Sequence, residues 1–333
     1  MIALSRKLIA AFVLLVMTAS AHAADKIKVT IAANDPSYAA YFVAIEKGYF
    51  RDAQLDLEMV SAGGGAATPA LMSGQVAFST SSGSAVSAIL KGAPLKVVMT
   101  MAVSLPFNLW ATAPEIKTLA DLKGKPVGVQ TRGDLFEVAL RAALLKQGLA
   151  ADSIIYSPLG IGTAQRLAIM QTGAMPAVIL SILDEQVARN HGDMTHAHLL
   201  FDMRRDLQIP YNGLATSDAL IAAKPAIVRR FLTGVMQGVR YMKRFHGGTL
   251  RIMQKYNKDA SPELLDRSLD ESTAMVLESG TAPVDLQSSE IALRRSMLGL
   301  SAQGGPSPET VFDYSFVQQA LAELDRAGWQ PQE

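Results

Sequence analysis

The chain has 333 residues, a formal net charge of +1 and no cysteine. This length is enough for two domains with cores that need no disulfides. The absence of cysteine excludes thiolate nucleophiles, iron–sulfur clusters and cysteine-type zinc sites. The near-neutral charge argues against a nucleic-acid partner, which would require a basic face.

The N-terminal segment, residues 1–23, has the three parts of an export signal. A positive start at Arg6 and Lys7 precedes the apolar run Leu8–Val16, which is too short to span a bilayer. The small-x-small motif Ala21–Ala23 then provides a cleavage site, and the polar residues after it argue against the alternative of a retained helix. We therefore expect a cleavable signal peptide and a periplasmic protein with no membrane insertion after cleavage. Without a cysteine for lipid attachment, the mature chain is expected to be free in a host that has an outer membrane.

Two blocks of the mature chain show the same order of strands and helices. In the first block, the expected strands are Ile27–Ile31, Leu55–Val60 and Val76–Phe78. In the second block, they are Val127–Val129, Ile154–Tyr156 and Ala177–Leu180. The glycines after the first helices, Gly48 and Gly148, are 100 positions apart, and those after the second helices, Gly74 and Gly173, are 99 apart. We interpret the two blocks as an internal repeat.

The segments between these strands have helical patterns. The first block contains an expected helix at Tyr38–Lys47, and the second block contains expected helices at Leu135–Gln147 and from Thr163 onward. Strands that alternate with such helices indicate parallel βαβ units, so the repeat predicts two α/β lobes. In open parallel sheets a ligand lies beyond the carboxyl ends of the strands. We therefore expect the loops at those ends to meet in one cleft between the lobes.

The remaining elements set the predicted lobe limits. Leu95–Ala102 and Asn108–Thr112 are expected to be strands that leave the first lobe, and Pro210–Thr216 a strand that returns to it. Further helices are expected at Pro225–Phe245, Pro262–Ser268, Gln287–Leu300 and Tyr314–Ala327. Chain crossings near Ala111–Pro114 and Tyr211–Gly213 would form a two-stranded hinge. The expected lobes are residues 25–111 with 213–333, and residues 112–212.

Three motifs carry a resemblance to a known family. They are Tyr41–Phe50 followed by Leu55–Leu57, Leu119–Val129, and Gly162–Leu167. In their order and spacing they resemble the solute-binding proteins of ABC importers, in the branch for nitrate, sulfonate, taurine and thiamine-pyrimidine precursors. The resemblance covers most of the mature chain except the C-terminal helices. It implies an α/β, two-lobed type II periplasmic binding fold that closes over a small ligand, with an ABC permease and its ATPase as partners.

Polar and small residues stand at the expected strand ends of the first lobe. The candidate ligand contacts are Asn34, Ser37, Tyr38, Gly64, Gly65, Thr80 and Ser81. Glycine lets the backbone approach a ligand, hydroxyls can donate or accept, and Tyr38 offers an aromatic wall with a polar tip. The alternatives are a flexible turn at the glycines and a helix cap at the hydroxyls. Tyr41 and Phe42 are expected in the core.

The second lobe has a candidate anion site before a helix. Its candidate contacts are Thr131, Arg132, Gly133, Asp134 and Ser181. Free N–H groups at a helix start favour an anion, and Arg132 could add forked donors. The alternative is a plain helix cap, because Asp134 would itself occupy the anion site. Arg166, an unfavourable cation in a first helical turn, is expected to pair with a group in its own lobe.

We predict no catalytic site, metal or cofactor. His196 and His198 would share a strand face, but no clustered carboxylates accompany them, so we expect solvated histidines. Nucleophile-elbow and phosphate-loop motifs are absent from the sequence. The sequence therefore predicts a monomeric, non-enzymatic carrier of a small polar or anionic molecule, such as a sulfonate, taurine, nitrate-like anion or pyrimidine precursor. A secreted enzyme on the same fold and a ligand sensor read by a receptor are the alternatives.

Overall fold

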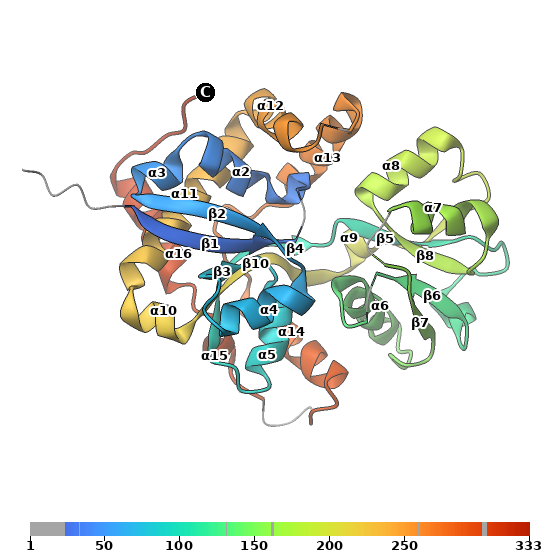
Figure 1. The fold of residues 1–333 in the computed structure, drawn as a ribbon. Coiled ribbons are helices and arrows are strands. Elements are labelled where there is room, and N and C mark those ends of the chain that lie inside the picture. The colour runs from blue at the N-terminus through green and yellow to red at the C-terminus, as the bar shows by residue number, and fades with distance from the viewer. Residues whose placement is uncertain (1–23, 33, 131, 161–162, 259, 302–304) are drawn as a thin grey trace, which may run out of the picture.

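The computed structural model describes residues 24–32, 34–130, 132–160, 163–258, 260–301 and 305–333. It forms two lobes, each built on a five-stranded sheet with helices around it (Figure 1). The predicted signal peptide lies outside the described residues. Within the described part of the chain, no helix combines the length and the apolar character needed to cross a membrane.

The first sheet has the strand order β2-β1-β3-β10-β4. Its strands are β1 Asp25–Ile31, β2 Leu55–Ser61, β3 Phe78–Ser79, β4 Leu95–Ser104 and β10 Gln208–Ser217. β1 pairs in parallel with both β2 and β3, whereas β10 runs antiparallel to β3 and β4. The strands predicted for the first block therefore form one parallel unit, with β3 slightly later than expected.

The second sheet repeats this arrangement in the order β7-β6-β8-β5-β9. Its strands are β5 Phe107–Ala111, β6 Pro126–Val129, β7 Ile155–Pro158, β8 Ala177–Ser181 and β9 His198–Phe201. β6 pairs in parallel with β7 and β8, and β5 runs antiparallel to β8 and β9. Both lobes thus place the first strand of a block between the other two, as an internal repeat requires.

The strand β5 corrects the predicted place of the first crossing. The sequence predicts that Asn108–Thr112 leaves the first lobe, but β5 is buried along its length and pairs only within the second sheet. Only Leu105 and Pro106 separate β4 from β5. A nearly continuous apolar run therefore hides the point where the chain changes sheet, and the crossing lies at these two residues.

The second crossing also lies earlier than predicted. Tyr211–Gly213 is part of β10 and pairs with β4, and the pairing already begins at Gln208. On this strand pairing we propose lobes of residues 24–104 with 208–333, and residues 105–207.

Helices cover both sheets. Those of the first lobe are η1 Pro36–Tyr38, α2 Ala39–Glu46, α3 Tyr49–Asp52, α4 Gly64–Met72, α5 Ser82–Ile89, α10 Asp218–Ala223, α11 Pro225–Arg244, α12 His246–Tyr256, α13 Pro262–Met275, α14 Val284–Met297, α15 Pro308–Val311 and α16 Ser315–Arg326. Those of the second are η2 Leu119–Leu122, α6 Leu135–Lys146, α7 Thr163–Thr172, α8 Ile182–His191 and α9 Met203–Asp206. α14 packs against α5 and β10 of the first lobe and α6 of the second, so it touches both lobes.

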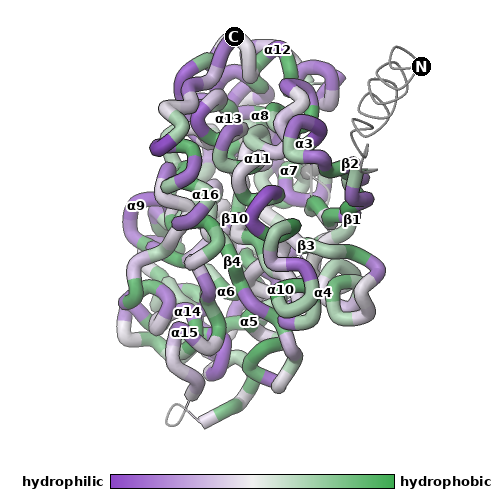
Figure 2. The backbone as a smooth tube through the Cα atoms, turned by 90° about the vertical axis from the view of Figure 1, so that its left-hand side faces the viewer, coloured by the Kyte–Doolittle hydropathy of each residue, from purple (hydrophilic) through white to green (hydrophobic). Residues whose placement is uncertain are grey.

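Aromatic packing fixes the core of the first lobe. The ring of Phe231 on α11 stacks against Phe78 at 4.2 Å and against Phe50 at 5.1 Å between centroids. Tyr41 and Phe42 are buried in the same core, which confirms their predicted role. Figure 2 shows apolar residues along β4, in the middle of this lobe. The packed core therefore fixes the positions of the strands whose ends carry the loops.

Candidate functional site

Polar side chains gather where β1 and β3 end, and we call this group the strand-end cluster. Its members are Asp35, Ser37, Tyr38, Thr80, Tyr211 and Asn212. The Asp35 carboxylate accepts hydrogen bonds from Ser37 N at 2.8 Å and Ser37 Oγ at 2.5 Å. Ser37 Oγ lies 3.2 Å from Tyr211 Oη, and Asn212 Nδ2 donates to the Ser37 carbonyl at 2.5 Å. The turn after β1 is therefore tied to β10, the strand that returns from the second lobe.

Burial sets the protonation of the strand-end cluster. Desolvation raises the pKa of Asp35, and the hydrogen bonds from Ser37 partly oppose this rise. Desolvation also raises the pKa of Tyr38 well above its usual value, and it raises the pKa of Tyr211. Both phenols therefore keep their protons at neutral pH and can donate to a ligand.

Two oxygens of the cluster are poorly satisfied, although the Thr80 hydroxyl interacts with the Tyr38 hydroxyl. Thr80 Oγ1 and Asn212 Oδ1 are buried without a well-formed hydrogen bond to any described residue. Such atoms are costly to bury unless a water or ligand satisfies them. The backbone of Asn212 is in the left-handed region, with φ of 52°, as is common for asparagine. The cluster thus presents hydroxyl donors beside unsatisfied oxygens.

The structure brings together three of the predicted contacts of the first lobe. Ser37, Tyr38 and Thr80 belong to the strand-end cluster and are buried. Asn34, next in the chain to this group, is exposed. These positions follow from the parallel pairing of β1 and β3, which carries their carboxyl ends to one edge of the sheet.

The predicted glycine loop of the first lobe is partly wrong. Gly64 and Gly65 form the first turn of α4, with Gly63 at its N-cap, so only the residues before Gly64 are a loop. The alanines and the leucine that follow favour a helix, so α4 begins at the glycines. Ser81 stands at the N-cap of α5, but within the described residues its side chain makes no cap hydrogen bond.

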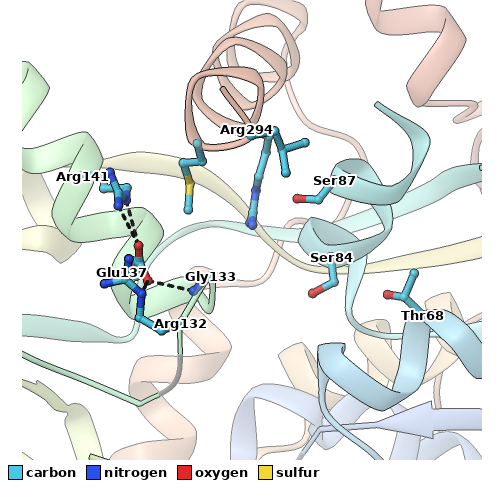
Figure 3. A pocket seen from close by; sticks show the side chains of 10 residues that line it. Thr68, Ser84, Ser87, Arg132, Gly133, Glu137, Arg141 and Arg294 are labelled. Atoms are coloured by element: carbon cyan, nitrogen blue, oxygen red, sulfur yellow. Dashed lines mark hydrogen bonds and ion pairs between the residues drawn. The ribbon is translucent and has the colours of Figure 1, made fainter. Parts of the chain in front are cut away.

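The predicted anion site before α6 also contains Glu137, which is not among the predicted contacts. Asp134 caps α6 by accepting from Glu137 N at 3.0 Å, as the alternative interpretation states. Glu137 Oε2 accepts from Gly133 N at 2.8 Å and lies 3.5 Å from Arg132 Nε (Figure 3). Glu137 Oε1 lies 2.9 Å from a terminal nitrogen of Arg141. A carboxylate of the chain itself therefore fills the helix start, and a glutamate three residues after the N-cap Asp134 is the sequence signal for it. The predicted contact Thr131 lies outside the described residues.

Ser181 has a structural role at the start of α8. Its hydroxyl accepts from Asp184 N at 3.1 Å, and Asp184 accepts from Ser181 N at 2.9 Å. The same carboxylate receives two hydrogen bonds from Arg166, at 2.7 and 3.1 Å. Both side chains of this pair are buried. The expectation that Arg166 pairs within its own lobe is thus confirmed.

A cavity of about 440 Å³ lies between the lobes. Its lining comes from α4, α5 and α14 of the first lobe and from the start of α6 in the second: Thr68, Ser84, Ser87, Arg132, Gly133, Glu137, Arg141, Arg294, Met297 and Leu298 (Figure 3). Three arginines and one carboxylate give the lining a net positive charge. Sequence reasoning missed Arg294, because nothing in the sequence of α14 distinguishes it from its neighbour Arg295.

A second set of contacts joins the lobes through α8, α9 and α13. Arg204 donates to Glu271 on α13 at 2.7 Å and to Glu185 on α8 at 3.3 Å. Glu185 also accepts from Asn108 at 3.1 Å and from Trp110 at 3.0 Å. Desolvation raises the pKa of Glu185, and its hydrogen bond from Trp110 and the charge of Arg204 oppose the rise. These contacts hold the lobes together at the side where α13 faces α8.

The two neighbouring histidines are not brought together with other metal ligands. His198 opens β9, and its Nε2 lies 2.7 Å from the Ile116 carbonyl, while His196 is exposed. No group of three or more histidine, aspartate or glutamate side chains suited to a metal is found in the part of the chain that the structure describes.

Known proteins resemble the chain in sequence and in fold. The model of the family described as NMT1/THI5 like matches residues 35–244. The riboflavin-binding protein RibY of Chloroflexus aurantiacus is 30% identical over 213 residues, which are 61% of this chain and 58% of that protein. The chain thus spans a little over half of the length of this relative.

Solved structures share the fold at lower identity. The alkanesulfonate-binding protein SsuA of Xanthomonas axonopodis pv. citri, bound to MOPS, has a TM-score of 0.65 and 17% identity, with 89% of this chain and 97% of that chain covered. The desulfurization enzyme DSZB has a TM-score of 0.62 and 15% identity, with 90% and 99% covered. The predicted two-lobed α/β fold is therefore confirmed, and it is a fold that serves binding proteins and at least one enzyme.

Proposed function

The chain belongs to the NMT1/THI5-like family, and from this premise we propose that it is a periplasmic solute-binding protein that delivers a small polar or anionic organic molecule to an ABC importer. The observation that carries the proposal is the cavity of about 440 Å³ lined by both lobes. A ligand that contacts both lobes stabilises their closed arrangement through the contacts made only there. The permease and its ATPase would then receive the closed form.

Two features support a polar ligand. The strand-end cluster offers neutral phenol and hydroxyl groups, and the cavity offers arginines. RibY is described as a riboflavin-binding protein, and SsuA is described as an alkanesulfonate-binding protein. A flavin, an alkanesulfonate, taurine, a nitrate-like anion and a pyrimidine precursor are therefore the ligands to test.

The first experiment is a ligand screen on residues 24–333, by thermal unfolding and calorimetry. We expect one class to raise the melting temperature, since a ligand at 100 times its Kd stabilises the folded state by about 2.7 kcal/mol. Native mass spectrometry of the purified protein would identify a retained ligand. Absence of any stabilising compound in the screen, with no retained ligand, would contradict the proposal.

The export step has its own test. Expression of the full chain in a bacterium with an outer membrane should yield a periplasmic protein whose N-terminus follows Ala23. An uncleaved cytoplasmic product would contradict the predicted export.

To distinguish a carrier from an enzyme on this fold, the bound compound is recovered after long incubation. We expect it unchanged, whereas a converted product would favour the enzyme.

A further inference from the structure

Arg294 on α14 has a buried guanidinium that the protein only partly satisfies. Its side chain is 5% exposed, and its Nε donates to Glu290 at 2.8 Å. This bond to Glu290 is the one side-chain hydrogen bond of Arg294 to a described residue, although an arginine has five N–H donors. In Figure 3 the side chain extends from α14 into the space between Gly133 and Ser84. Its charge is paired with Glu290, whose Oε2 makes no hydrogen bond among the described residues, while its terminal nitrogens face the cavity.

The guanidinium lies at the start of α5. A Cβ added to Gly83 would clash with Arg294 Nη2, so the two are in direct contact. Gly83 is in the first turn of α5, and the N-cap Ser81 makes no side-chain cap hydrogen bond among the described residues. Glu290 Oε1 also lies beside Gly83, so the Arg294–Glu290 pair as a whole is next to this helix start. A cation beside a helix N-terminus is unfavourable, whereas an anion placed between the two would be attracted by both.

Hydroxyl groups complete the same wall of the cavity. Thr68 on α4 is 7% exposed, and its Oγ1 has no hydrogen-bond partner among the described residues. Ser84 and Ser87 line the cavity from α5, and the Ser87 hydroxyl donates a long hydrogen bond of 3.3 Å to the Gly83 carbonyl. A buried hydroxyl without a partner costs free energy that a ligand oxygen would recover.

The opposite wall is less suited to an anion. There Glu137 already pairs with Arg132 and Arg141, and Arg141 also pairs with Asp152 at 2.6 Å. Since these charges largely satisfy one another, the remaining donors among the described lining residues are the terminal nitrogens of Arg294 and the first-lobe hydroxyls.

We propose that Arg294, with the hydroxyls of Thr68, Ser84 and Ser87, forms an anion-binding subsite on the first lobe that holds the acidic group of the transported molecule. This inference rests on the proposed function and adds that the ligand carries a carboxylate, sulfonate or phosphate. Arg294 lies outside residues 35–244, the part that the family model matches. The arginine of the subsite therefore comes from α14, outside the matched part, whereas its three hydroxyl residues lie inside it.

The test measures binding of ethanesulfonate, inorganic phosphate and propionate by calorimetry, with riboflavin as a neutral comparison. Because Arg294→Gln alone would leave Glu290 unpaired, the double variant Glu290→Gln/Arg294→Gln is used as well. We expect at least one anion to bind the unaltered chain and to lose about tenfold or more in affinity in both variants. The anion bound most tightly identifies the acidic group.

Two further variants separate the subsite from general effects of charge. Gly83→Ala keeps the charge but displaces the guanidinium, so we expect it to weaken the anion several-fold. Arg295→Gln removes a neighbouring cation whose Nε donates to the Ser301 carbonyl, and we expect it to leave affinity within about twofold.

The inference and the proposed function fail in different ways. Unchanged anion affinity in a folded double variant would overturn the subsite, and so would a chain that binds riboflavin but none of the three anions. Both results would leave the proposed function intact. Only a chain that binds nothing in the wider screen contradicts the proposed function itself.

Discussion

The two lobes share a parallel three-strand unit but finish their helix starts differently. In the second lobe, side chains of the chain itself cap α6 and α8, through Asp134 and Ser181. In the first lobe, α4 and α5 begin at Gly63 and Ser81 and make no side-chain cap hydrogen bond within the described residues. Free N–H groups at a helix start attract an anion. The starts of α4 and α5 therefore lack the side-chain caps that α6 and α8 have, although the Arg294–Glu290 pair lies beside the start of α5.

The same contrast holds for the buried carboxylates. Asp184 in the second lobe pairs with the guanidinium of Arg166. Asp35 in the first lobe has only the hydroxyl and N–H groups of Ser37 as hydrogen-bond donors among the described residues. The comparison indicates that the Asp184 carboxylate is stabilised by a buried ion pair, whereas the Asp35 carboxylate has neutral donors alone among the described residues. Four substitutions test this difference, and they follow in order of expected effect.

The largest effect is expected for Asp184→Asn. This change removes the carboxylate from a buried pair, and breaking such a pair typically costs about 3–5 kcal/mol. Urea unfolding of the variant measures the loss. Glu58→Gln is the matched control, because Glu58 pairs with Lys28 in solvent, where such a pair is worth about 1 kcal/mol or less. A similar loss in both variants would show that the pair in the second lobe has no special role.

The second change, Glu137→Gln, would open the helix start of the second lobe. It removes the carboxylate that occupies the position before α6 and lies beside the cavity. We expect affinity for ethanesulfonate to rise about tenfold, because a negative charge near the bound anion is lost. Asp152→Asn is the control, since it removes another partner of Arg141 on an exposed side chain. Unchanged or weaker binding in Glu137→Gln would contradict the view that Glu137 fills this site.

The third change, Ser81→Asp, would give the first lobe the acidic cap that the second already has. A cap hydrogen bond and a charge at the helix start should stabilise the fold by about 0.5–1 kcal/mol. The same charge should weaken ethanesulfonate binding several-fold, as calorimetry would show. Ser81→Asn separates these effects, because asparagine caps without charge and should weaken anion binding less than aspartate does. Equal binding by the aspartate variant and the unaltered chain would mean that the start of α5 does not face the ligand.

Local patterns predict most of the sheets and little of the site. The alternation in β1 and the lengths of α2 and α6 carry the repeat, so both parallel units follow from the sequence. The sheet that β5 joins does not follow, because pairing between distant segments decides it. Local patterns in a single sequence do not predict such pairing between distant segments.

The site shows the same limit at the level of side chains. The motif before α6 predicts an anion site, yet Glu137, three residues after Asp134, fills it. Arg294 and Arg295 are neighbours with the same chemistry, and only packing places the first in the cavity while the second donates to the Ser301 carbonyl. Residue type suggests what a side chain can bind, but packing decides whether its groups are still available.

The smallest effect concerns the pH dependence of stability through Asp35. Desolvation raises the pKa of this carboxyl in the folded chain above the usual value of 3.8, so the folded state binds the proton more tightly than the unfolded state. Its contribution to stability is therefore fully present below pH 3.8 and is lost as the pH rises through the raised folded value. Asp35→Asn keeps an oxygen for the Ser37 donors and cannot ionise. The unfolding free energy of the unaltered chain minus that of Asp35→Asn should thus decrease as the pH rises through this window, as urea unfolding at several pH values would measure. A difference that increases with pH would mean that Ser37 stabilises the charged form more than burial destabilises it, and the contrast with the ion-paired Asp184 would then disappear.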